Sequence, residues 1–102
     1  MLESSYQQKL IKRLRYIFGG CVVIKNDPTY IQGLPDLLIL YGNKWAMLEV
    51  KADGQAEHQP NQDYYVERLN AMSFAAFIFP QNETYILNRL SDFFMEGIRN
   101  DI

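Results

Sequence analysis

Apolar residues recur in the first part of the chain with the period of a helix. Those three or four positions apart are Tyr6, Leu10, Leu14 and Ile17. This spacing predicts an amphipathic helix that ends at Gly19-Gly20. Ser5 and Gln8 have the spacing of a capping box, which would place the start of the helix at Ser5.

Three short apolar runs follow, and their alternation and β-branched residues predict strands. The runs are CVVIK (21–25), PDLLILY (35–41) and KWAMLEVKA (44–52). In the first run, Cys21, Val23 and Lys25 share one side. The second and third are separated by Gly42-Asn43, a hairpin signal that pairs Tyr41 with Lys44.

The second half of the chain predicts a further helix, two strands and a last helix. Pro60 suits the first turn of the middle helix, whose inward stripe would contain Gln62, Tyr65, Leu69 and Met72. FAAFIF (74–79) predicts a parallel central strand, and TYIL (84–87) another strand. Ser91 has the place of an N-cap, with Leu90 and Met95 as a hydrophobic staple. The predicted order α-β-β-β-α-β-β-α indicates an α/β fold with a mixed β-sheet flanked by helices.

Composition indicates an ordinary globular protein, with one domain over residues 1–102. The chain is 48% hydrophobic and 22% charged, and its single cysteine, Cys21, allows no internal disulfide and no four-cysteine zinc site. The first residues lack the pattern of a signal peptide, and no apolar run is long enough to cross a bilayer. We therefore expect a cytoplasmic protein with no membrane partner.

The net charge of −2 is unevenly distributed. Residues 1–25 contain five Lys or Arg and one Glu, a charge of +4, so the rest of the chain carries −6. Overall charge argues mildly against a nucleic-acid partner, while a local basic face can still follow phosphates.

Three charged side chains interrupt the apolar strands. Continuing the hairpin register places Asp36 directly opposite Glu49, and Lys51 lies two residues beyond Glu49 on the same face. Facing carboxylates repel one another and require a cation between them. Lys51 could supply it within a structural ion network, or a divalent metal such as magnesium could do so with carboxylate oxygens.

These residues resemble a known family. Gly33-Leu34-Pro35-Asp36, a hairpin and then Glu49-Val50-Lys51 is similar to the motif of the PD-(D/E)XK nuclease superfamily. Gln62 followed by Tyr65 resembles the Q-x-x-[YW] element of many members. The closest resemblance is to the small virus-type replication-repair nucleases (VRR-NUC), which are related to Holliday junction resolvases. It covers most of the chain and implies a restriction-endonuclease-like fold.

The resemblance also implies roles for individual residues. Asp36, Glu49 and the Val50 carbonyl would bind Mg²⁺, for which Mn²⁺ can substitute, and no organic cofactor would be needed. Lys51 would position or activate the attacking water, and Gln62 would support the site or the scissile phosphate. Family members place an acid on the first helix. Glu3 is the candidate here, unless the helix starts after it.

The function implied is a magnesium-dependent DNA endonuclease, structure-specific for a junction, flap or nicked duplex. It would hydrolyse phosphodiester bonds in the replication, repair or recombination of phage or mobile-element DNA. Relatives of this size commonly act as homodimers, and the apolar segment Tyr85–Phe94 is a candidate dimer surface. Two alternatives stay open: a catalytically inactive DNA-binding module of the same fold, and an interaction protein in which the charged trio is structural.

Several other residues have both a functional and a structural interpretation. Lys9, Lys12, Arg13 and Lys25 could contact DNA phosphates or simply be solvated. The sole histidine, His58, is expected in a loop. Tyr64 and Tyr65 could stack on bases, or Tyr65 could belong to the core. Cys21 is expected to be a small buried residue.

Overall fold

The computed structural model describes residues 2–100, with side chains for residues 2–96. In chain order, its elements are α1 (Glu3–Ile17), β1 (Val22–Lys25), β2 (Leu37–Tyr41), β3 (Lys44–Val50), α2 (Gln62–Met72), β4 (Ala75–Ile78) and α3 (Glu83–Asn100).

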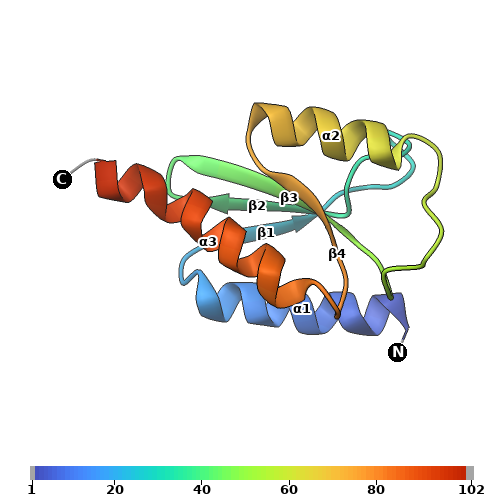
Figure 1. The fold of residues 1–102 in the computed structure, drawn as a ribbon, viewed down its shortest axis with the longest axis horizontal. Helices are drawn as coiled ribbons and strands as arrows, with labels where there is room; N and C mark the ends of the chain where they lie inside the picture. Colours follow the sequence, from blue (N-terminus) through green and yellow to red (C-terminus); the bar gives the residue numbers. More distant parts are fainter. Residues whose placement is uncertain (1, 101–102) are drawn as a thin grey trace.

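The described strands form one mixed sheet between two helical layers. Its strand order is β1-β2-β3-β4: β1 pairs antiparallel with β2, β2 pairs antiparallel with β3, and β3 pairs parallel with β4. Figure 1 shows α2 on one face of the sheet and α1 with α3 on the other. The general prediction of an α/β fold with a mixed sheet flanked by helices is therefore confirmed.

The core lies between the sheet and the layer of α1 and α3. Leu10 and Leu14 of α1 and Leu90 of α3 are fully buried there against β2 and β3 side chains such as Ile39 and Leu48. Since side chains alternate along a strand, the residues that alternate with Ile39 and Leu48 point to the α2 face. The candidate site is built on that opposite face.

The end of the chain differs from the sequence prediction. Thr84–Leu87 is not a strand and Ser91 is not an N-cap, because both lie inside the single helix α3. Asn82 starts this helix: its side-chain oxygen accepts a hydrogen bond from the Phe79 N–H at 2.9 Å, and its carbonyl accepts one from the Ile86 N–H. The order among the described residues is therefore α-β-β-β-α-β-α. As a consequence, β4 is an edge strand, not the predicted central strand.

Two helix starts also differ from prediction. The capping box is wrong, because α1 begins at Glu3 and the Tyr6 N–H already bonds the Leu2 carbonyl. Pro60 is not in the first turn of α2, which begins at Gln62 after Asn61 in the left-handed conformation. The predicted end of α1 is confirmed, since Gly20 has a φ of 88° just beyond it.

Apolar side chains remain exposed on the part of the sheet that α2 leaves uncovered. Val22 and Ile24 of β1 and Leu40 of β2 are 51%, 42% and 39% exposed. By contrast, the apolar side chains of Tyr85–Phe94 are largely used within the chain, since Ile86, Leu87, Leu90 and Phe94 are buried in the core. Among the described residues, no helix is both long enough and apolar enough to cross a bilayer.

Candidate active site

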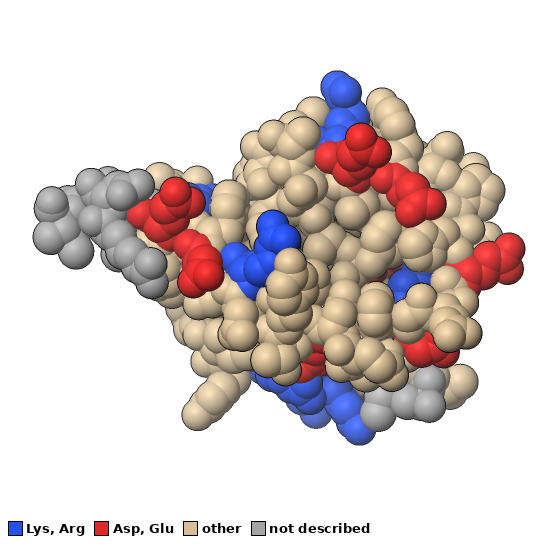
Figure 2. Space-filling view, viewed as in Figure 1, with Lys and Arg blue, Asp and Glu red and all other residues tan. Residues whose placement is uncertain are grey.

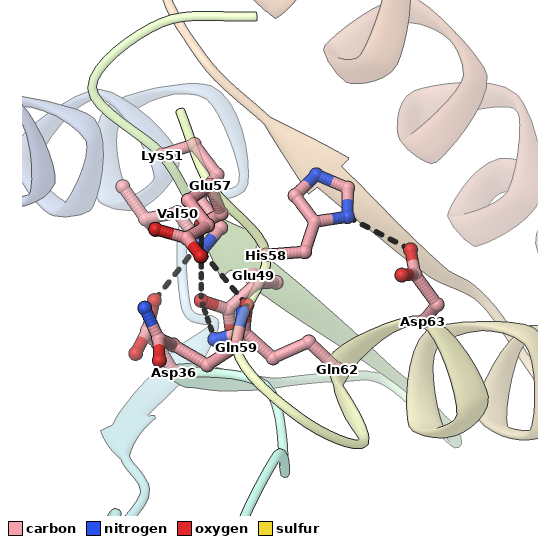
Figure 3. Close-up of polar contacts among 9 residues, drawn as sticks. All are labelled: Asp36, Glu49, Val50, Lys51, Glu57, His58, Gln59, Gln62 and Asp63. Carbon is pink, nitrogen blue, oxygen red and sulfur yellow. Dashed lines mark hydrogen bonds and ion pairs between the residues drawn. The ribbon is translucent and has the colours of Figure 1, made fainter. Parts of the chain in front are cut away.

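The hairpin brings the two predicted carboxylates to one end of the sheet. The register Tyr41↔Lys44, Leu38↔Met47 and Leu37↔Leu48 confirms the predicted pairing. Asp36 directly precedes β2, and its Oδ2 accepts a hydrogen bond from the Val50 N–H at 2.9 Å. Asp36 therefore lies beside the end of β3 that holds Glu49, on the face that α2 covers (Figure 3).

Glu49 and Lys51 are both buried, with 2% and 5% of their surface exposed. Gln62, the first residue of α2, joins them. Its Nε2 donates to Glu49 Oε2 at 3.0 Å, and its Oε1 accepts from Lys51 Nζ at 2.8 Å. The Lys51 ammonium also donates to the Glu57 carbonyl at 3.0 Å and lies 3.9 Å from Glu49 Oε2. Gln62 thus connects the predicted metal-binding and water-positioning side chains (Figure 3).

One carboxylate oxygen of this cluster has no partner. Glu49 Oε1 is buried and accepts no hydrogen bond from any described residue. Burial and then the nearby Asp36 carboxylate raise the pKa of Glu49 to about 8, against the weaker opposing effect of Lys51. Lys51 therefore offsets this repulsion only in part. A proton held by Glu49 and shared with Asp36 compensates the pair at lower pH, and when both acids are ionised Glu49 Oε1 has no partner.

The donor set fits magnesium, which takes one or two carboxylates and keeps several waters. Asp36 and Glu49 would hold the ion, with the unpartnered Glu49 Oε1 as a free oxygen ligand. The described residues contain no cluster of three or more Asp, Glu, His or Cys side chains that could hold a metal. A site here would therefore depend on two carboxylates, water and other oxygens such as the Val50 carbonyl.

Glu3 lies close enough to the site to act on it electrostatically. It occupies the first turn of α1, where an acid is favourable for the helix dipole, and its side chain is exposed. Its charge is the smallest of the causes that raise the pKa of Glu49. Glu3 thus lies near the site but is not grouped with Asp36 and Glu49 as a third ligand.

Three supporting contacts, made by Asn26 and Gly33, were not predicted from the sequence. Asn26, just after β1, donates through its side chain to the Pro35 carbonyl and through its backbone N–H to the Asp36 carbonyl, both at 2.8 Å. Gly33, with a φ of 91°, packs so closely on Asn61 that an added Cβ would be 2.6 Å from the Asn61 Cβ. These contacts fix the loop that presents Asp36 against the start of α2. Loop residues of this kind follow no periodic pattern. Gly33, within the motif Gly33-Leu34-Pro35-Asp36, was nevertheless a signal visible in the sequence.

The other residues with both a functional and a structural interpretation are His58, Tyr64, Tyr65 and Cys21. His58 lies in the loop as predicted, stacks on Phe77 and hydrogen-bonds Asp63 at 2.8 Å. Tyr64 is exposed, whereas Tyr65 is half-buried beside it. Cys21 is half-buried, and burial raises the pKa of its thiol.

The four cations predicted to contact DNA do not form one surface. Arg13 pairs with the buried Glu83 of α3, which also accepts a hydrogen bond from Tyr6. Lys9 lies on that same side of α1, whereas Lys12 and Lys25 line a separate hollow next to β1.

Comparison of the chain with protein-family models, with curated proteins and with solved structures gave no significant match.

Proposed function

We propose that this protein is a magnesium-dependent DNA endonuclease of the PD-(D/E)XK type. The observation that carries the proposal is the buried Glu49 Oε1, which lacks a hydrogen-bond partner beside a second carboxylate and a buried lysine. A buried, unpaired carboxylate oxygen is costly, and a divalent cation would satisfy it. The order of the motif residues, with Gln62 at the start of the next helix, supports the same proposal.

When bound, magnesium would activate water and neutralise charge on the phosphodiester. The residues of the chain would hold and orient the reacting groups. Gln62 and the Glu57 carbonyl occupy two of the three donors of the Lys51 ammonium. The third donor is left to orient a water or to offset the charge that develops on the phosphate. Gln62 holds both Lys51 and Glu49 in place, which makes it a positioning residue.

The substrate class is proposed from the family resemblance. We propose branched or nicked DNA, cut by direct attack of water without a covalent intermediate, and a homodimer as the active form. The dimer would use a surface other than the buried side of α3.

The test is cleavage by purified protein of supercoiled plasmid, a flap and a four-way junction, each with magnesium, manganese or EDTA. Asp36→Asn should abolish cutting, and the matched control Glu67→Gln, an exposed acid on α2, should not. Metal-dependent cutting that disappears only in Asp36→Asn would support the proposal. No cutting of any substrate with either metal would overturn it.

A further inference from the structure

We propose that a basic hollow between α1 and β1 binds a backbone phosphate of DNA, outside the site of cleavage. This inference rests on the proposed function. The basic hollow has a volume of about 270 Å³ and is lined by Gln8, Ile11, Lys12, Arg15 and Lys25.

Cations from two elements converge on the basic hollow. Lys12 and Arg15 are three residues apart on α1 and therefore share one side of the helix. Lys25 is the last residue of β1 and points to the α1 face, because the alternate residue Val23 packs against the core. Arg15 lies close enough to the start of β1 that its charge lowers the pKa of the Cys21 thiol, opposing the larger effect of burial.

On the other side of α1, the cation Arg13 is neutralised by an acid of the same chain. A second hollow there is lined by residues that include Lys9 and Arg13, but it also contains the buried Glu83, which pairs with Arg13. The basic hollow has no acid among its lining residues. Lys12, Arg15 and Lys25 are in none of the ion pairs among the described side chains, although the chain beyond residue 25 carries an excess of acid. Three unpaired cations around one hollow point to an external anion.

The lining favours a phosphate of a nucleic-acid backbone. Arg and Lys donate to phosphate oxygens, and the Gln8 amide can add a further donor. Gln8, Ile11 and three cations offer no aromatic surface for a base, so the contact would be independent of sequence. Figure 2 shows Lys and Arg side chains gathered along α1 at the bottom of that view.

The position relative to Asp36 indicates which part of the DNA would be held. Lys25 is followed by Asn26, whose N–H bonds the Asp36 carbonyl, so the basic hollow begins at the same end of the sheet as the site. Lys25 and Asp36 point to opposite faces, however, since Lys25 pairs with Leu37 of the core face. DNA at Asp36 would have to pass around the β1 edge to reach the hollow. The phosphate bound there would therefore belong to an arm beyond the cleaved bond.

The test measures binding of a labelled four-way junction in EDTA over a series of salt concentrations. Each phosphate neutralised in B-DNA contributes about −0.9 to the slope of log K against log salt. Lys25→Gln and the double variant Lys12→Gln/Arg15→Gln should each weaken binding and make the slope shallower by about 1. Arg89→Gln removes one charge from α3 and should leave the slope unchanged. All these side chains are exposed, so thermal melting should show folded variants.

The outcomes separate this proposal from the proposed nuclease. Wild-type protein that binds with the expected loss of slope in the variants, yet cuts nothing with magnesium or manganese, would support the basic hollow and overturn the nuclease. Metal-dependent cutting with slopes that are the same in all variants would overturn the basic hollow alone. A wild-type protein that neither binds nor cuts DNA would overturn both.

Discussion

Replacement of Glu49 by Gln tests whether the buried carboxylate is destabilising until a metal occupies the site. The pKa of Glu49 rises from its ordinary value of 4.5 to about 8 in the folded protein. A carboxyl group with a raised pKa holds its proton more tightly when folded. Its contribution to stability is therefore present at low pH and is lost as the pH rises from about 4.5 to about 8.

The size of this loss follows from the same shift. One proton changes the free energy of unfolding by about 1.4 kcal/mol per pH unit within that window, or roughly 3 kcal/mol between about pH 5.5 and 7.5. For a domain of this size, that corresponds to a decrease in Tm of more than roughly 10 °C. The substituted amide is neutral at every pH and can accept from Gln62 while donating to Asp36. We expect Glu49→Gln to lack this pH dependence and to be more stable than wild type near pH 8.

The assay is thermal unfolding of both proteins in EDTA across this pH range, repeated with magnesium. Magnesium should raise the Tm of wild type near pH 8, because it binds the folded carboxylates, and should have little effect on Glu49→Gln. The control Glu67→Gln, which changes an exposed acid, should follow wild type. If Glu49→Gln were less stable than wild type near pH 8, the Glu49 carboxylate would be a stabilising partner of Lys51, and the reasoning would be refuted.

Three further variants test the supports of the site. Gln62→Leu removes the acceptor at 2.8 Å from the buried Lys51 ammonium and should lower the free energy of unfolding by about 1–3 kcal/mol; equal stability in urea unfolding would contradict this. Gly33→Ala should cost about 2 kcal/mol or more and suppress cleavage, because the added Cβ meets Asn61 at a positive φ, while Gly42→Ala, in open space, should cost less and preserve cleavage. Glu83→Gln weakens the contacts with Arg13 and Tyr6 on the α1 and α3 side of the sheet, the face opposite the two carboxylates. It should therefore lower Tm by several degrees but leave magnesium-dependent cutting of the folded protein intact.

The proposed site combines residues with strong and weak sequence signals. Asp36, Glu49 and Lys51 could be placed together from the hairpin alone, because Gly42-Asn43 defines the turn and the period of two defines the face. The hydrogen bond from Gln62 to Glu49 could not be predicted in this way, because it depends on how α2 crosses the sheet. Asn26 and the contact between Gly33 and Asn61 were not predicted, because irregular loops have no periodicity to follow.

The error in the last third of the chain has a similar cause. Ile86, Leu87, Leu90 and Phe94 form a buried stripe at helical spacing, but the apolar residues at its start also suit a short strand. Local pattern does not separate these alternatives. Tertiary packing separates them, because the single long helix α3 buries this stripe against the same core as α1.

By itself, the sequence determined the antiparallel hairpin, the amphipathic first helix and the presence of two acids and a lysine on one strand face. These depend on turn chemistry and side-chain period, which are local properties of the chain. Only the tertiary structure decided that Glu49 keeps a buried oxygen without a partner, and that Arg13 is neutralised while Lys12 and Lys25 are not. Burial and charge compensation depend on which distant segments pack together, so they cannot be predicted from any one stretch of sequence.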